Sequence, residues 1–136
     1  MNKDIPSAEH HRERLTRLRE ALLHLHKALV DSERIGYEKN IGTIPSPNYF
    51  LQLLTRDPWF AWLHPLSELI VAMDEALDAR EPLTSAVAEF LVLQTRHLLA
   101  ASESGEGFAR HYFDALQRDP DVVMAHAVVV RLFKLP

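Results

Sequence analysis

The sequence has 136 residues, of which 47% are hydrophobic and 25% charged, and its formal net charge is −4 at pH 7. A chain of this length and composition can bury a core of its own, which fits one globular domain and excludes collagen-like and low-complexity classes. It contains no Cys, which excludes disulfide scaffolds, thiolate zinc sites and thiol catalysis and is typical of a reducing compartment.

The distribution of apolar and basic residues excludes two further classes. The N-terminal sequence has no apolar segment of the kind found in secretion signals, and the longest uncharged runs, 58–67 and 122–130, are shorter than the roughly 18 residues that a membrane span needs. The arginines between positions 12 and 19 alternate with acidic residues and lack aromatic neighbours, which indicates a solvated helix face. We therefore expect a cytoplasmic protein that binds neither membrane nor nucleic acid.

The first predicted element is a long helix over about 7–38, capped by Ser7. Its leucines step three and four residues apart, as in the packing seam of a coiled coil: Leu15, Leu18, Leu22, Leu25 and Leu29. A linker over about 40–47 follows, because Asn, Gly and Pro cluster there. The remaining helices are expected within 48–134, so that residues 1–136 form one domain.

Three corners of the chain pair a capping side chain with a proline. A proline suits the first position of a helix, so each pair predicts a helix start. The pairs are Ser46–Pro47, Asp57–Pro58 and Asp119–Pro120. The segment 47–56 is accordingly predicted to be a short helix that ends before Pro58.

The second half of the chain contains four more predicted helices. Residues 65–79 form an amphipathic helix that we expect to run antiparallel to the first helix. The next helix, about 82–101, is apolar around much of its girth, which places the region of Phe90 at the centre of the bundle. Helices over 105–118 and 119–134 then meet at a tight corner. These patterns predict an all-α, compact single-domain bundle of about five or six helices with proline-marked corners.

A short motif occurs twice in the sequence, as YFLQLLTRDP at 49–58 and YFDALQRDP at 112–120. In both copies a histidine follows the proline by six residues, at His64 and His126. A duplicated helix-corner-helix unit would produce this pattern. The common local rules for ending one helix and capping the next explain it equally well, and we favour them because nothing else repeats.

Eight histidines in a helical bundle suggest a metal or haem site, because neutral imidazole is a good ligand for iron, zinc and copper. The candidate ligands are His24, His26, His64, Glu68, His97 and His126. One histidine per helix, together with HPLSE at 64–68, resembles the hemerythrin family, whose four-helix bundles bind oxygen at two irons held by His and carboxylates. The resemblance implies iron as the cofactor.

The sequence departs from the hemerythrin pattern in its later helices. Where the family has His-x-x-x-His in its third helix, His97 has Leu93 and Ala101 at the corresponding positions. Where the family has His-x-x-x-x-Asp, His126 is followed by Arg131. These departures leave too few ligands for two irons.

A proline also weakens the pairing of His64 with Glu68. Pro65 lacks an amide proton and disfavours helical angles at the residue before it, so we expect the helix to begin at Pro65 with His64 outside it. The two side chains would then not share a helix face. We interpret His64 as a corner residue that bonds to backbone.

Trp59, Phe60 and Trp62 are the candidate interface or pocket residues. At helical spacing they span more than one buried stripe, so part of their surface faces something besides the adjacent helix. Core packing under the linker is the favoured explanation, an interface with a second chain is the next, and a small-molecule pocket is the third.

The sequence contains no phosphate-binding loop, dinucleotide fingerprint or nucleophile elbow, so we do not expect an enzyme. The leading interpretation is a non-catalytic interaction or regulatory module without a cofactor. Its partner is a second protein, or itself in a homodimer formed through the seam of the first helix or the Trp59–Trp62 corner. The alternative is a histidine-based protein that binds or senses oxygen or a metal through iron or haem.

Overall fold

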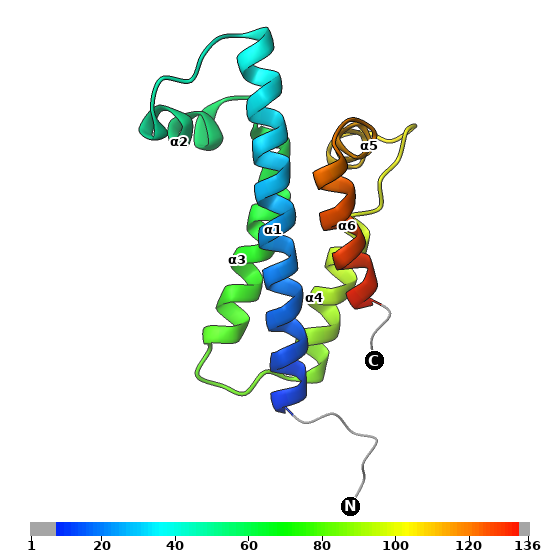
Figure 1. Ribbon diagram of the computed structural model, residues 1–136. Coiled ribbons are helices and arrows are strands. Elements are labelled where there is room, and N and C mark those ends of the chain that lie inside the picture. The colour runs from blue at the N-terminus through cyan, green and yellow to red at the C-terminus, as the bar shows by residue number, and fades with distance from the viewer. Residues whose placement is uncertain (1–7, 134–136) are drawn as a thin grey trace, which may run out of the picture.

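The computed structural model describes residues 8–133, and all regular structure in this range is helical (Figure 1). The elements are α1 (Ala8–Asn40), α2 (Pro47–Arg56), the 3-10 turn η1 (Ala61–Leu63), α3 (His64–Asp78), α4 (Ser85–Leu98), α5 (Phe108–Arg118) and α6 (Pro120–Phe133). This confirms the predicted all-α bundle. Ser7, the predicted cap of the first helix, lies outside the described residues. No helix between residues 8 and 133 is long and apolar enough to cross a membrane.

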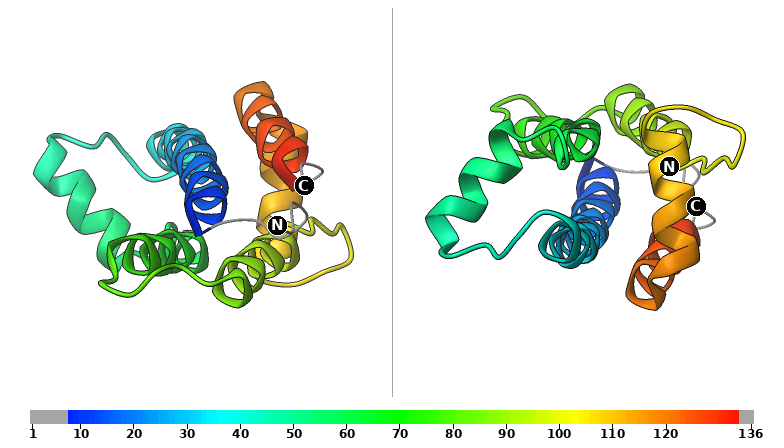
Figure 2. Two further views of the ribbon diagram at one scale, coloured as in Figure 1. Left: turned by 90° about the horizontal axis from the view of Figure 1, so that it is seen from below. Right: turned by 90° about the horizontal axis from the view of Figure 1, so that it is seen from above.

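The long helix α1 lies at the centre of the bundle and packs against α3, α4 and α6 (Figure 2). The expectation that the helix around Phe90 is central is wrong. That helix, α4, lies at the side of the bundle and buries one stripe of its surface, while Phe90 is exposed. α1 contacts α3, α4 and α6, whereas α4 contacts mainly α3 and α1, so one side of α4 has no helix packed against it.

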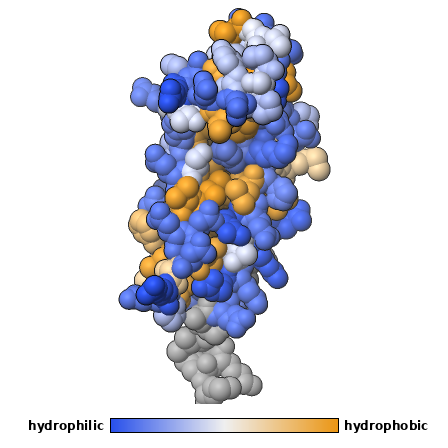
Figure 3. Space-filling view, turned by 90° about the vertical axis from the view of Figure 1, so that its left-hand side faces the viewer, coloured by the Kyte–Doolittle hydropathy of each residue, from blue (hydrophilic) through white to orange (hydrophobic). Residues whose placement is uncertain are grey.

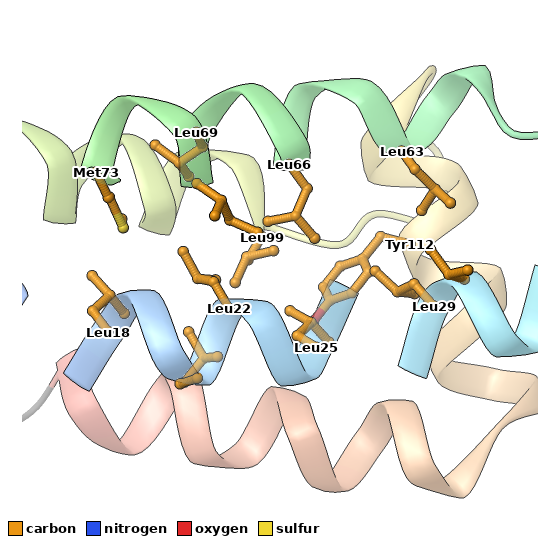
Figure 4. Close-up of a cluster of buried hydrophobic side chains, with 14 of the residues drawn as sticks. Leu18, Leu22, Leu25, Leu29, Leu63, Leu66, Leu69, Met73, Leu99 and Tyr112 are labelled. Carbon is orange, nitrogen blue, oxygen red and sulfur yellow. The ribbon is translucent and has the colours of Figure 1, made fainter. Parts of the chain in front are cut away.

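The core forms where the leucine seam of α1 meets α3. Figure 4 shows the seam residues opposite those of η1 and α3 in reverse order, with Leu18 near Met73 and Leu29 near Leu63, which confirms that α1 and α3 are antiparallel. All four of these side chains are buried, and burying each stabilises the fold by about 2 kcal/mol. The seam is therefore occupied by helices of the same chain.

The predicted capping pairs lie at the corners of the fold. The Ser46 hydroxyl accepts a hydrogen bond from the Tyr49 amide at 3.1 Å, and α2 begins at Pro47. Asp119 accepts one from the Asp121 amide at 2.9 Å, and α6 begins at Pro120. Asp57 caps in the same way, but the chain continues there into a turn and η1 before a regular helix forms.

His64 lies inside α3, contrary to the expectation that Pro65 would exclude it. Its backbone angles, φ −56° and ψ −41°, are helical. The preceding turn η1 leads directly into α3, and Pro65 costs little there because amides of the first helical turn have no acceptor within the helix. The chain instead turns at Asp57, whose angles are extended.

Three other helices have boundaries that differ from those predicted. α4 begins after Thr84, whose hydroxyl accepts a hydrogen bond from the Val87 amide at 3.2 Å, and it ends at Leu98. α5 begins after Gly107, which has a φ of +59° that favours glycine. α1 continues to Asn40, two residues beyond the predicted end.

The two copies of the Tyr-Phe motif differ in their environments. Tyr112 is fully buried, whereas Tyr49 is exposed. What the copies share is the end of a helix at Arg-Asp-Pro, with the aspartate as cap. The shared feature is therefore local, as the capping rules predict.

Candidate functional site

The largest apolar side chains that α4 exposes lie together on its outward side. Its buried stripe consists of small and aliphatic residues and one threonine: Ala88, Leu91, Val92 and Thr95. Because the helix is apolar around its girth, Val87, Phe90 and Leu93 remain between 42% and 58% exposed. Exposed apolar side chains gathered on one helix are typical of a surface that contacts another molecule.

A groove of about 360 Å³ lies between α3 and α4, and of these three side chains Phe90 lines it. Its lining residues are mainly apolar: Pro65, Leu69, Ala72, Phe90, Leu91 and Leu98, with Glu68 and Gln94 as the polar members. α3 and α4 run in opposite directions along the groove (Figure 1). The groove is thus a mainly apolar channel between two antiparallel helices.

The α3 side of this groove is acidic. α3 carries four carboxylates and no Lys or Arg, and only Asp74 pairs with a base, Arg19, at 2.9 Å. Glu68 lines the groove, and Glu75 follows it by two helical turns on the same face. Neither of these two has an ion-pair partner among the described residues.

The face over α2 and α3 looks different. There, apolar side chains lie in patches along the middle of the face, bordered by polar side chains (Figure 3). Among the exposed apolar residues of these helices are Leu51 and Val71. No groove between α2 and α3 accompanies the exposed Leu51 and Val71 among the described hollows.

The candidate aromatic residues join η1 to its neighbours. Phe60 is fully buried and contacts Tyr37 and Phe50, with ring centroids 5.7 Å apart in both cases. The Trp59 indole donates a hydrogen bond to the Glu33 carbonyl at 3.2 Å.

Trp62 completes this corner by contacting α5. It stacks on His111 with centroids 5.2 Å apart and packs against Phe108. Phe60 therefore belongs to the core, and Trp59 and Trp62 are half-buried.

A polar cluster beside Trp59 was not found by sequence reasoning. Arg118 of α5 donates to the Ser32 hydroxyl at 3.2 Å and to the Glu33 carboxylate at 2.8 Å. Two hollows of about 280 and 470 Å³ adjoin this pair and share Trp59 as a wall. Glu33 could have been identified, because it continues the stripe of Leu25 and Leu29 at helical spacing yet is charged. Its partner could not, since it lies 85 residues away.

Two candidate metal ligands have partners in neighbouring helices. His26 and the Ser67 hydroxyl lie 2.9 Å apart, linking α1 to α3, and burial lowers the pKa of His26. His64 Nε2 lies 3.0 Å from the Leu54 carbonyl oxygen of α2. His64 thus makes the backbone contact expected of it, although it lies inside the helix.

The other candidates lie apart from these two. His126 Nδ1 is 2.6 Å from the Tyr112 hydroxyl, and burial lowers the pKa of His126. His24 and His97 are exposed on α1 and α4, and Glu68 lies at the groove. Within residues 8–133, no three His, Asp or Glu side chains form a group that could hold a metal ion.

Comparisons of the chain with protein-family models, curated proteins and solved structures give no match. The fold and the surface chemistry are therefore the basis for a function.

Proposed function

We propose that this protein is a non-catalytic interaction module that binds a helix of a partner protein in the groove between α3 and α4. The observation that carries this proposal is the 58% exposure of Phe90, which lines an apolar groove and has the exposed Val87 and Leu93 near it on the same helix. Covering these side chains removes apolar surface from water at a gain of about 25 cal/mol per Å². Aromatic side chains such as Phe90 are common anchors of protein interfaces.

The shape of the groove favours a helix as the occupant. A helix laid along two antiparallel helices presents apolar residues at every third and fourth position, and these fit a continuous apolar channel. The walls of this channel include Leu69 on α3 and Phe90 on α4, and both residues belong to regular helices.

The charge of the groove selects the type of helix. Glu68 and Glu75 on the α3 side favour a partner helix whose apolar stripe is flanked by Lys or Arg. A second copy of this chain would bring the same two carboxylates to the interface, and like charges there are unfavourable. This disfavours a symmetric pair of grooves, and we propose a different protein as the partner. Because the chain has no Cys, we place this interaction in the cytoplasm.

Two labelled synthetic peptides test this proposal. Both have the same helical leucine stripe, but one is flanked by Lys and the other by Glu, and binding is measured by fluorescence anisotropy. We expect the Lys peptide to bind wild type and to bind Phe90→Asp at least about tenfold more weakly, because the change puts a charge into the apolar contact. Leu51→Asp is the matched control, since Leu51 is exposed on α2 away from the groove, and it should bind like wild type.

The charge requirement has its own variant. Glu68→Lys combined with Glu75→Lys should reverse the preference toward the Glu peptide. If neither peptide binds wild type, or if Phe90→Asp binds as wild type does, the proposed function is wrong. If Phe90→Asp weakens binding but the charge reversal has no effect, the groove is retained and the basic partner is rejected.

The alternative function, a histidine-based metal or haem protein, makes a different prediction. It requires several of His24, His26, His64, His97 and His126 to meet at one centre. Three of them instead have separate hydrogen-bond partners, which disfavours a shared centre. Stoichiometric metal or a Soret band in the purified, untagged protein would contradict our proposal.

A further inference from the structure

α6 has two apolar faces, and only one of them is covered. Val122 and Val129 are fully buried in the core, where α6 packs against α1. On the other side, Val123, Met124 and Val128 are between 45% and 69% exposed. α6 lies at the edge of the bundle (Figure 2). Its outer face is therefore a second apolar surface, independent of the groove between α3 and α4.

The outer face of α6 has an acidic residue at one end and a basic residue at the other. Asp121, Met124, Val128 and Arg131 follow one another at steps of three and four residues, so they form one stripe along the helix. Asp121 and Arg131 are the charged residues of α6, and both are exposed. Neither forms an ion pair with another described residue.

We propose that this stripe binds the same stripe of a second copy of the chain, with the two α6 helices antiparallel across a twofold axis. In this arrangement Asp121 lies opposite Arg131 of the second copy, and Met124 lies opposite Val128 of the second copy. Each contact occurs twice, as a closed twofold interface requires. The apolar middle is covered and the charged ends are paired.

Charge decides the direction of the two helices. A parallel pair would place Asp121 against Asp121 and Arg131 against Arg131, and both contacts would be repulsive. The acidic residue also lies at the N-terminus of α6 and the basic residue at its C-terminus, where each stabilises its own helix dipole. An experiment can separate the pairing between two copies from the effect on the helix dipole. Exchanging Asp121 and Arg131 makes their interaction with the dipole of α6 unfavourable but preserves the ion pairs between the copies.

The association is expected to be weak. α6 has 14 residues, and a contact between two helices of this length buries less surface than the roughly 1,200–2,000 Å² of a standard stable interface. We therefore expect a dissociation constant on the order of 0.1 mM, which corresponds to a few apolar contacts and two exposed ion pairs.

Sedimentation velocity of the full chain between about 10 µM and about 1 mM tests the proposal. Wild type should pass from monomer to dimer over this range. Asp121→Arg, Arg131→Asp and Met124→Asp should each remain monomeric with an unchanged circular dichroism spectrum. The double variant Asp121→Arg with Arg131→Asp should dimerise again, although its helix dipole is less favourable and its melting temperature is lower. Asp78→Arg, at an exposed site on α3, is the control and should dimerise like wild type.

Several results would overturn the twofold pairing. These are a monomer at the highest concentration, single charge variants that still dimerise, and a double variant that does not recover. A fourth is loss of the dimer in Phe90→Asp, which would mean that α6 of one copy occupies the α3–α4 groove of another. The peptide experiment on the groove is independent of the first three results, whereas the fourth would also contradict the proposal that a different protein occupies the groove.

Discussion

At the scale of single residues, the surroundings of two half-buried histidines lower their pKa values. His126 lies against the Tyr112 hydroxyl, and His26 against Ser67. Burial lowers the pKa of both histidines from the ordinary value of 6.5, because a low-dielectric environment disfavours the charged imidazolium. Burial also raises the pKa of Tyr112, so its hydroxyl stays protonated beside His126 Nδ1.

These shifts predict that stability falls on mild acidification. Below about pH 6.5, His26 and His126 take up protons more readily in the unfolded chain than in the folded protein. Protonation therefore stabilises the unfolded state relative to the folded state. Thermal melting followed by circular dichroism should give a lower melting temperature at pH 5.5 than at pH 7.5. The loss should continue until the pH passes the lowered pKa values of the folded state.

A variant separates this effect from general acid sensitivity. His126→Phe removes one of the two groups and should reduce the difference in melting temperature between the two pH values. His97→Gln is the control, since His97 is exposed on α4, and it should keep the wild-type difference. An equal pH dependence in wild type and His126→Phe would contradict the explanation by burial.

At the scale of elements, side-chain caps fix where helices begin. At the start of α4, the Thr84 hydroxyl accepts a hydrogen bond from the amide of Val87, three residues later in the chain. The sequence had suggested a start at Pro82, because proline suits a first helical position. The threonine decides the boundary because its oxygen satisfies an amide that otherwise has no acceptor in the helix.

Removing this cap should destabilise the protein. Thr84→Ala is expected to lower the free energy of unfolding by about 1 kcal/mol, the usual cost of losing a threonine cap. Urea denaturation measures the change. Thr43→Ala, in the exposed linker, replaces the same residue type away from a helix start and should leave stability unchanged within error. Equal effects of the two substitutions would show that Thr84 does not act as a cap.

At the scale of the whole molecule, one helix organises the bundle. α1 presents its leucine seam to α3 and contacts α4 and α6 as well, so its buried residues connect most of the core. Such a seam is also the pattern of a coiled coil, and the sequence therefore suggested a dimer there. The seam is filled by helices of the same chain, which directs any self-association to another surface.

This arrangement predicts a large difference between two adjacent leucines of α1. Leu22 is fully buried and Leu23 is exposed. Leu22→Ala should lower the free energy of unfolding by about 2–5 kcal/mol, because it removes buried apolar atoms and leaves a cavity. Leu23→Ala should cost well under about 1 kcal/mol, since alanine is a good helix former and little burial is lost. Comparable losses in urea denaturation would contradict the central position of α1.

The exposed side of α4 could not be predicted from the sequence. The sequence identified α4 as apolar around its girth, and this is the property that creates the exposed surface of Phe90. It could not tell which stripe would be buried, so it placed the whole helix at the centre. Burial of one stripe depends on how many helices surround it, and α4 meets only α3 and α1 closely.

The sequence by itself determined what depends on neighbouring residues. Helical periodicity, the capping pairs and the breaks between helices are local, because a helix is held by hydrogen bonds four residues apart and ended by side chains next to it. Only the tertiary structure decided what depends on distant residues, such as the pairing of Glu33 with Arg118 and the separate partners of the histidines. Packing of whole helices sets these contacts, and it also decides which apolar faces, on α4 and α6, remain uncovered.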